Sequence, residues 1–363
     1  MTAAPPTRPH RQEAEPASDE VTEVAPGVLR LQLPIPLPGL RHVNCYALED
    51  ERGWAVVDPG MPGPWFWRAL EQRFRTAGFR TRNVHTVVLT HSHPDHFGGA
   101  GRIRQVAGAE VVSSASFRLW WDPDTSDDTS PDDADEQPVL EPEPRSGAER
   151  RTPWGTVRPM PPKRIRMALG MLGPLRKRLF PTPRPTRRLN DAATIQLGRR
   201  EWVAVHTPGH TPDHLCLFDP EGGTLLAGDH VLPTITPHVS GLDSGDDPLG
   251  TFMASLDKVA GLDGAQTILP AHGHPFTGLI DRVDDIKRHH DDRLDRLRTH
   301  LAEMGEATVT ELSHQLFRPR SWGGLAESET YAHLEHLRLG GTVTRRDDSG
   351  SRRIVYALKN DGQ

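Results

Sequence analysis

Short apolar runs alternate with turn residues from Val21 onward, which predicts a series of antiparallel strands. The runs V-L-R-L-Q-L, V-N-C-Y-A-L-E and W-A-V-V-D follow one another closely. Apolar spacing then predicts helices over 64–77 and 99–106, on either side of a buried strand over 87–90. Strands resume at 194, 202–205, 214–218 and 223–227, before a helix over 249–259 and a strand over 268–269. This order predicts an α/β domain of layered sheets and helices over 20–280.

The pattern changes at both ends of the chain. Residues 1–19 are rich in Pro, Ala and Glu without periodicity, which predicts a disordered tail. Helical spacing covers 282–302, 308–317 and 327–339, and two β-rich runs joined by D-D-S-G follow at 342–345 and 353–358. Three helices followed by a hairpin outline a winged-helix domain over 281–363.

Two charge blocks of opposite sign interrupt the central domain over about 121–190. Residues 121–143 contain no Lys or Arg, whereas Glu149 is the only acid in residues 145–188. This insert is interpreted as a lid over an anionic, partly apolar substrate, as a surface for membrane or nucleic acid, or as a solvated excursion. The position of the insert between two histidine-bearing segments favours the lid. The pair Trp120-Trp121 could pack this lid against the domain, and the alternative is that both belong to the core. The composition of the insert offers little core, so we expect its removal to cost modest stability.

Composition narrows the class of protein. The chain has 363 residues, a net charge of −6 and no apolar run long enough for a signal or a membrane span, which predicts a cytoplasmic protein without stable membrane insertion. Cys45 and Cys216 both lie in apolar strand-like runs. A disulfide framework and a thiolate metal site are therefore not expected.

The strongest chemical signal is H-S-H-P-D-H, residues 91–96, directly after the apolar run V-V-L-T. Three imidazoles and a carboxylate within six residues are unlike the side chains of a hydrophobic core. They indicate either a solvated polar loop or a metal site. Imidazole nitrogen and carboxylate oxygen are also the ligands that a borderline divalent metal prefers. Three further segments end an apolar run on a residue of the same type: T-P-G-His210, L-L-A-G-Asp229 and L-P-A-His272. We expect these side chains to meet at one edge of a sheet.

These four segments, together with V-V-Asp58-P-G upstream, resemble the metallo-β-lactamase superfamily over residues 20–280. The resemblance implies an αββα sandwich with two metal ions. It assigns His91, His93 and His210 to the first ion, Asp95, His96 and His272 to the second, and Asp229 to a bridging position. It also implies that Asp58 orders the ligand loop by hydrogen bonding. No ligand position is substituted, which favours two ions over one.

Two ions about 3.5 to 4 Å apart can hold a hydroxide and polarise a substrate oxygen, so hydrolysis is the expected chemistry. Asp95 would orient the hydroxide as well as bind metal. Zinc is the expected metal, with iron or manganese as alternatives.

The remaining histidines are assigned lesser roles. His214, four residues after His210, is a second candidate catalytic residue that could donate to the substrate oxyanion, with a structural strand histidine as the alternative. His238 could touch substrate or order its loop. Structural or solvated positions are expected for His206, His274, His289 and His290.

The C-terminal domain resembles the winged helix in a branch of the superfamily that includes β-lactamase-like and glyoxalase II-like proteins. Arginines at 345, 346, 352 and 353 flank the expected wing, but Asp347 and Asp348 lie beside them. The preceding helix, E-S-E-T-Y-A-H-L-E-H-L-R-L, carries as much acid as base, which would repel phosphate. We therefore expect this domain to pack or to pair subunits in a homodimer, with Leu334 and Leu337 in its core.

Four functions remain open at this point. The favoured one is hydrolysis of a small-molecule thioester, ester or lactone with an anionic or acyl portion. A metal-dependent nuclease acting on RNA or DNA is the first alternative, and an iron-dependent sulfur dioxygenase is the second. A regulator that binds DNA through the winged helix alone is disfavoured by the complete ligand set.

Overall fold

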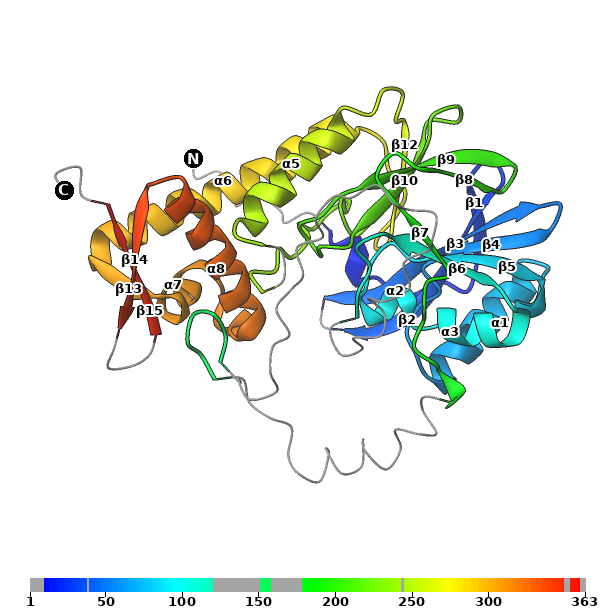
Figure 1. Cartoon of the computed structure of the whole chain (residues 1–363), viewed down its shortest axis with the longest axis horizontal. Coiled ribbons are helices and arrows are strands. Elements are labelled where there is room, and N and C mark those ends of the chain that lie inside the picture. The colour runs from blue at the N-terminus through cyan, green and yellow to red at the C-terminus, as the bar shows by residue number, and fades with distance from the viewer. Residues whose placement is uncertain are drawn as a thin grey trace, which may run out of the picture.

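The computed structural model describes residues 10–37, 39–119, 151–157, 178–242, 245–348 and 353–359. Within these ranges two β-sheets face one another and helices cover the outer face of each (Figure 1). The predicted αββα sandwich is confirmed. No helix among these residues has both the length and the apolar character needed to cross a membrane.

The first sheet contains the strands expected from the alternating runs of the N-terminal third. Its order is β1 (Val21–Ala25), β2 (Val28–Leu37), β3 (Leu40–Asp50), β4 (Gly53–Val57), β5 (Val84–Val88), β6 (Glu110–Ser114) and β7 (Arg187–Leu189). Pairing is antiparallel from β1 to β4 and parallel from β4 to β7. Helices α1 (Pro64–Thr76) and α3 (Ala100–Ala107) cover one face, and the short helix η2 (Thr81–Asn83) precedes β5. In α1, Trp67, Leu70 and Phe74 recur at helical spacing and are buried against the sheet.

The second sheet has the order β12 (Thr267–Pro270), β11 (Thr224–Gly228), β10 (Leu215–Asp219), β9 (Arg200–His206) and β8 (Thr194–Leu197). Strands β10 and β11 are buried at every position, because the first sheet covers one face and helices cover the other. Those helices are α5 (Pro248–Ala260) and α6 (Leu279–Met304), which lie side by side (Figure 1).

The C-terminal elements follow the predicted order of helices and a final hairpin. They are β13 (Glu306–Thr308), α7 (Val309–Leu316), η4 (Pro319–Ser321), α8 (Gly324–Leu339), β14 (Val343–Asp348) and β15 (Arg353–Leu358), with β15 central in a three-stranded sheet. Leu334 and Leu337 are buried in a core that continues into α5 and the second sheet. Helix α6 is shared by both regions, and the winged-helix assignment stays a prediction.

The acidic residues of helix α8 do not form the surface that the expected repulsion of phosphate requires. Glu327, Glu329 and Glu335 are 7%, 7% and 4% exposed, because α8 is enclosed by α5, α6, α7 and the C-terminal strand β14. Each carboxylate is paired: Glu327 accepts from the Trp154 indole, Glu329 pairs with Arg293, and Glu335 with Arg345. The acids of α8 therefore form internal contacts and do not present a repulsive surface.

The described part of the predicted disordered tail packs on the domain. Residues 12–14 form the short helix η1 (Gln12–Ala14), and Glu13 is fully buried. Its carboxylate accepts hydrogen bonds from the backbone amides of Thr234 and Ile235, at 2.9 and 3.1 Å. The composition of the tail cannot reveal this contact, because it depends on one residue, Glu13, whose partners lie more than 200 positions further along the chain. Residues 1–9 lie outside the described range.

One segment of the insert belongs to the core, contrary to the expectation that the insert buries little. Trp154 is 2% exposed and lies in the same hydrophobic cluster as α5, α6 and α8. Its indole nitrogen donates to Glu327 Oε2 at 2.9 Å, and its ring centroid is 5.2 Å from that of Tyr331. Residues 120–150 and 158–177, with Trp120, Trp121 and the predicted lid, lie outside the described residues.

We expect Trp154→Ala to lower the free energy of unfolding by about 3 to 5 kcal/mol, because a large buried ring and its hydrogen bond are lost. Trp65, which is 60% exposed on α1, provides the control, and Trp65→Ala should change stability by about 0.5 kcal/mol or less. Denaturant unfolding of both variants measures the difference. Equal stability of the two variants would contradict the core assignment of Trp154.

Candidate metal centre

Four of the predicted ligands lie on one turn at the carboxyl end of β5. The strand ends at Val88, Leu89 and Thr90 extend it, and His91 begins the turn. The short helix α2 (Pro94–Phe97) follows, with His93 at its N-cap and Pro94 in its first turn. Proline fits a first helical position, where no backbone amide is needed. The helix places Asp95 and His96 beside His91.

The other three predicted ligands come from the second sheet. His210 follows β9, Asp229 directly follows β11, and His272 follows β12. All seven side chains therefore meet, as expected, but at one edge of the two facing sheets and not of a single sheet.

The ligand atoms form two adjoining groups. In one, atoms of His91, His93, His210 and Asp229 all lie within 4.8 Å of one another, and in the other the same holds for Asp95, His96 and His272. Asp229 lies between the groups. Its Oδ2 is 3.5 Å from the Nε2 atoms of both His210 and His96, and its Oδ1 is 3.3 Å from His272 Nε2.

Backbone carbonyl groups fix the orientation of two of the imidazoles. His210 Nδ1 donates to the carbonyl oxygen of His238 at 2.7 Å, and His272 Nδ1 donates to that of His42 at 2.6 Å. A nitrogen that donates carries the proton of a neutral ring, so the Nε2 of each ring points inward with a lone pair.

Asp58 fixes two more rings. It accepts from the amide and hydroxyl of Thr90 at 2.9 and 2.7 Å, and from His96 Nδ1 at 2.9 Å. Because the Thr90 hydroxyl donates to Asp58, it is free to accept from His91 Nδ1, 3.0 Å away. His91 and His96 thus also direct Nε2 inward. Asp58 has a φ of 53°, a costly conformation for a residue with a side chain, which this network maintains.

Burial keeps the three imidazoles of the first group neutral. It lowers the pKa of His93 to about 3, and it lowers the pKa of His91 and His210 as well. In the second group burial also acts to lower the pKa of His96 and His272, but nearby carboxylates, above all Asp229, outweigh it and raise both. Neutral imidazole and ionised carboxylate are the forms that bind a metal ion.

Three of the inward atoms lack partners of their own. His96 Nε2, His272 Nε2 and Asp229 Oδ1 are buried without a hydrogen bond. Lone pairs and a carboxylate that converge on one space repel each other unless a cation lies between them. The donor set and its unsatisfied atoms therefore fit divalent metal ions.

His214 does not take the substrate-facing position that the sequence suggested for a catalytic residue. It is fully buried, and both ring nitrogens are used: Nε2 accepts from the Asp229 amide at 3.0 Å and Nδ1 donates to the Thr207 hydroxyl at 2.8 Å. A Cβ at Gly228 would lie 2.6 Å from His214 Nε2, so glycine is required there. The ring holds the backbone that carries Asp229 and has no donor left for a substrate.

The other histidines have structural contacts. His206 Nε2 lies 2.9 Å from the Pro212 carbonyl, and His274 Nε2 lies 2.8 Å from Glu15. His290 Nδ1 is 3.0 Å from His333 Nε2 in the interior between α6 and α8. His238 contacts other residues through both its backbone and its ring. Its carbonyl accepts from His210, and its ring lies 3.3 Å from Glu329 Oε2, so it helps to order its loop.

Two contributors were missed by the sequence argument. Thr90 connects Asp58 to His91, and its place directly before the histidine cluster was the available signal. His42 acts through its backbone carbonyl, so its residue type gave no signal.

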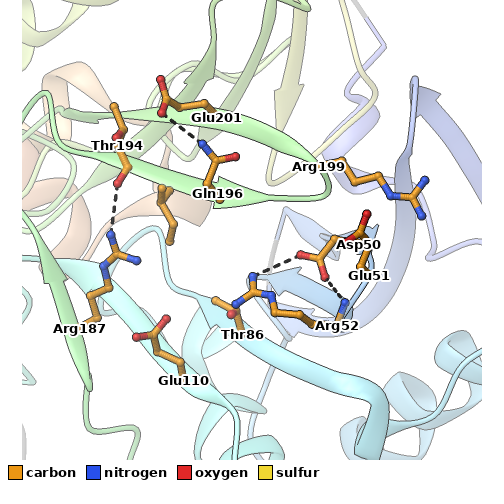
Figure 2. A pocket seen from close by; sticks show the side chains of 11 residues that line it. Asp50, Glu51, Arg52, Thr86, Glu110, Arg187, Thr194, Gln196, Arg199 and Glu201 are labelled. Carbon is orange, nitrogen blue, oxygen red and sulfur yellow. Dashed lines mark hydrogen bonds and ion pairs between the residues drawn. The ribbon is translucent and has the colours of Figure 1, made fainter.

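A polar cleft also lies at the opposite edge of the sandwich (Figure 2). It is lined by the β3–β4 turn, Thr86 of β5, the first residues of β6 and β7, and the β8–β9 hairpin. Arg52 pairs with Asp50, and Arg187 donates to the Thr194 carbonyl, as the dashed lines in Figure 2 show. None of the seven metal-site residues lines this cleft.

Comparison with known proteins agrees with this geometry. The profile of the Metallo-beta-lactamase superfamily matches residues 38–272, which contain all seven residues. The probable metallo-hydrolase YqjP of Bacillus subtilis is 26% identical over 330 residues, covering 87% of this chain and 94% of that protein. A hydroxyacylglutathione hydrolase of Albidiferax ferrireducens is 26% identical over 248 residues, 68% of each chain. The crystal structure of a metallo-beta-lactamase family protein from Thermus thermophilus superposes with a TM-score of 0.71 at 29% identity, covering 93% of this chain and 100% of that one.

We expect His214→Ala to act through stability. Loss of the ring leaves the Asp229 amide unpaired and opens a cavity, so the free energy of unfolding of the metal-free protein should fall by about 2 kcal/mol or more. Denaturant unfolding after chelation measures this without a contribution from bound metal. His300→Ala is the control, since His300 lies on α6 with Glu303 3.5 Å away, and it should cost about 0.5 kcal/mol or less. An unchanged stability with lost turnover would restore the catalytic interpretation of His214.

Proposed function

We propose that this chain, which belongs to the metallo-β-lactamase superfamily, is a hydrolase whose seven clustered residues hold two divalent metal ions. The proposal assigns His91, His93 and His210 to one ion, and Asp95, His96 and His272 to the other, with Asp229 between them. The observation that carries this proposal is that four of the histidines each use Nδ1 in a hydrogen bond to a neighbouring residue. Each Nε2 lone pair is therefore directed inward, toward the space between the ligands. Zinc suits this nitrogen and oxygen donor set, with iron and manganese as alternatives.

When bound, two such ions lower the pKa of a water molecule and polarise the oxygen of a scissile bond. The residues of the chain supply orientation and proton transfer. Asp95 Oδ2 lies 3.6 Å from His272 Nε2 and 3.7 Å from His96 Nε2, so its carboxylate borders the second group. At 6% exposure it is buried but not sealed off, which suits a group that accepts a proton from the attacking water.

The proposed substrate is a small molecule with an acyl bond, namely a thioester, an ester or a lactone. The relative named hydroxyacylglutathione hydrolase acts, by its name, on an acylated glutathione, and it matches 68% of this chain. The match to YqjP, named a probable metallo-hydrolase, extends over 87% of the chain and so includes part of the C-terminal region. Both relatives favour hydrolysis over the dioxygenase alternative.

A binuclear site predicts close to two metal equivalents in the purified protein. His93→Ala and Asp229→Ala should each lose metal and turnover together, because each removes a ligand atom from the cluster. Elemental analysis, coupled to assays with acyl thioesters, esters, lactones and β-lactams, tests this. His300→Ala should retain both metal and activity. Full activity after exhaustive chelation would contradict the metal-dependent mechanism.

The nuclease alternative predicts tight, salt-sensitive binding of nucleic acid through the wing. Two of its arginines are already paired: Arg345 with Glu335 at 3.2 Å, and Arg346 with Glu306 at 2.7 Å. These ion pairs reduce the positive charge available to phosphates. Arg352 lies outside the described residues.

We therefore expect single-stranded RNA and duplex DNA to bind no more tightly than about 1 µM at physiological salt, as in non-specific association. Fluorescence anisotropy titrations at several salt concentrations measure this. Sub-micromolar binding that weakens steeply with salt, and that is lost when Arg345, Arg346, Arg352 and Arg353 are replaced by Ala, would favour the nuclease.

A further inference from the structure

The loop over residues 230–242, between Asp229 and α5, contains no helix or strand. Its backbone groups are satisfied by other parts of the chain instead. Glu13 accepts from the amides of Thr234 and Ile235, and Arg282 of α6 donates to the carbonyls of Leu232 and Ile235. Remote elements therefore determine the conformation of this loop.

The part of the loop that touches the metal centre is held by α8. The His238 carbonyl accepts from His210 Nδ1 at 2.7 Å, and the His238 ring places its Nδ1 3.3 Å from Glu329 Oε2. The other oxygen of Glu329 pairs with Arg293 of α6. Glu329 is 7% exposed, so this carboxylate is fixed by partners on both sides and is little screened by water.

Close packing leaves this part of the loop little freedom. The Gly241 amide donates to Ser328 Oγ at 3.0 Å, and a Cβ at Gly241 would lie 2.6 Å from the Ser328 carbonyl oxygen. Val239 is fully buried in the cluster that α8 shares. A displacement of α8 would thus move the His238 carbonyl, and with it the ring of His210.

We propose that Glu329 is a positioning residue for the metal ligand His210 and acts through His238. It holds the His238 ring, the loop backbone follows, and the His238 carbonyl then fixes the tautomer and direction of His210. This inference rests on the proposed function, because it needs His210 to bind metal. It gives the C-terminal region a defined task at the hydrolytic site.

The second group of ligands is anchored elsewhere. His272 Nδ1 donates to the His42 carbonyl, and the His42 ring in turn donates through Nδ1 to the Glu15 carbonyl at 2.8 Å and accepts from the Gly273 amide at 3.0 Å. This network belongs to the N-terminal segment and does not include α8. A change at Glu329 should therefore weaken one of the two metal equivalents and spare the other.

The test compares Glu329→Gln and His238→Ala with two matched controls. Glu327 lies on the same helix with the same 7% exposure, but its carboxylate binds Trp154 and Thr310. His336 contacts Asp247 at 3.0 Å, which is another histidine–carboxylate contact made by α8. Glu327→Gln and His336→Ala thus remove comparable contacts that do not reach His210.

The measurement is competition for Zn²⁺ against a chromophoric chelator, with the intact full-length chain. We expect Glu329→Gln and His238→Ala each to weaken one equivalent about 10-fold, the lower end of the range for partners of metal ligands. The double variant should be no weaker than the weaker single variant, because both changes break one chain of contacts. Both controls should retain two equivalents at wild-type affinity.

Unchanged affinity in both test variants would overturn the inference. Equal weakening of both equivalents would also overturn it, because it would indicate a general loss of stability. So would losses that add in the double variant, because they would indicate that the two residues act independently. His238→Ala keeps the Glu329 and Arg293 pair, so it remains informative if Glu329→Gln folds poorly. Fewer than two equivalents in the wild-type protein would instead contradict the proposed function.

Discussion

The structure depends on a single electrostatic constraint. Imidazole lone pairs and carboxylate oxygens converge at one edge of the sheets, where they repel each other unless a cation lies between them. Four rings can hold this arrangement because each outer nitrogen is engaged: His91 by Thr90, His96 by Asp58, and the remaining two by backbone carbonyls. These hydrogen bonds select one tautomer and one ring direction before any metal arrives. The unpaired atoms that remain, such as His272 Nε2, are then available as ligands.

The outer hydrogen bonds make the site depend on segments that carry no ligand. The Glu15 carbonyl supports the backbone beside His272 through His42, and Glu13 holds the loop over 230–242. Helix α8 supports the loop beside His210, and Trp154 of the insert packs beneath that same helix. The C-terminal region is therefore part of one continuous core with the hydrolase domain, and its buried acids serve internal contacts.

Three incorrect assignments have related causes. Composition suggested a disordered tail and an insert without core, but single residues, Glu13 and Trp154, fix the described parts of both segments. For His214, its place after a ligand histidine suggested a role facing substrate, whereas its ring points to the backbone of Asp229. Sequence spacing locates such a residue near a site, but only its neighbours decide which way its ring is turned.

The apolar pattern of the sequence by itself indicated layered sheets and helices with ligand-type residues at strand ends, and the resemblance carried by those motifs implied the αββα arrangement and the set of seven residues. The segments that carry these residues follow apolar strands, and the ends of strands in the two facing sheets lie close together. The tertiary structure alone decided the tautomers, the buried position of His214 and the contact from α8 to His210. These features rest on contacts between distant residues, such as His272 with His42, which are 230 positions apart. No local pattern encodes a pairing of that kind, since the chain must fold before either partner has a neighbour.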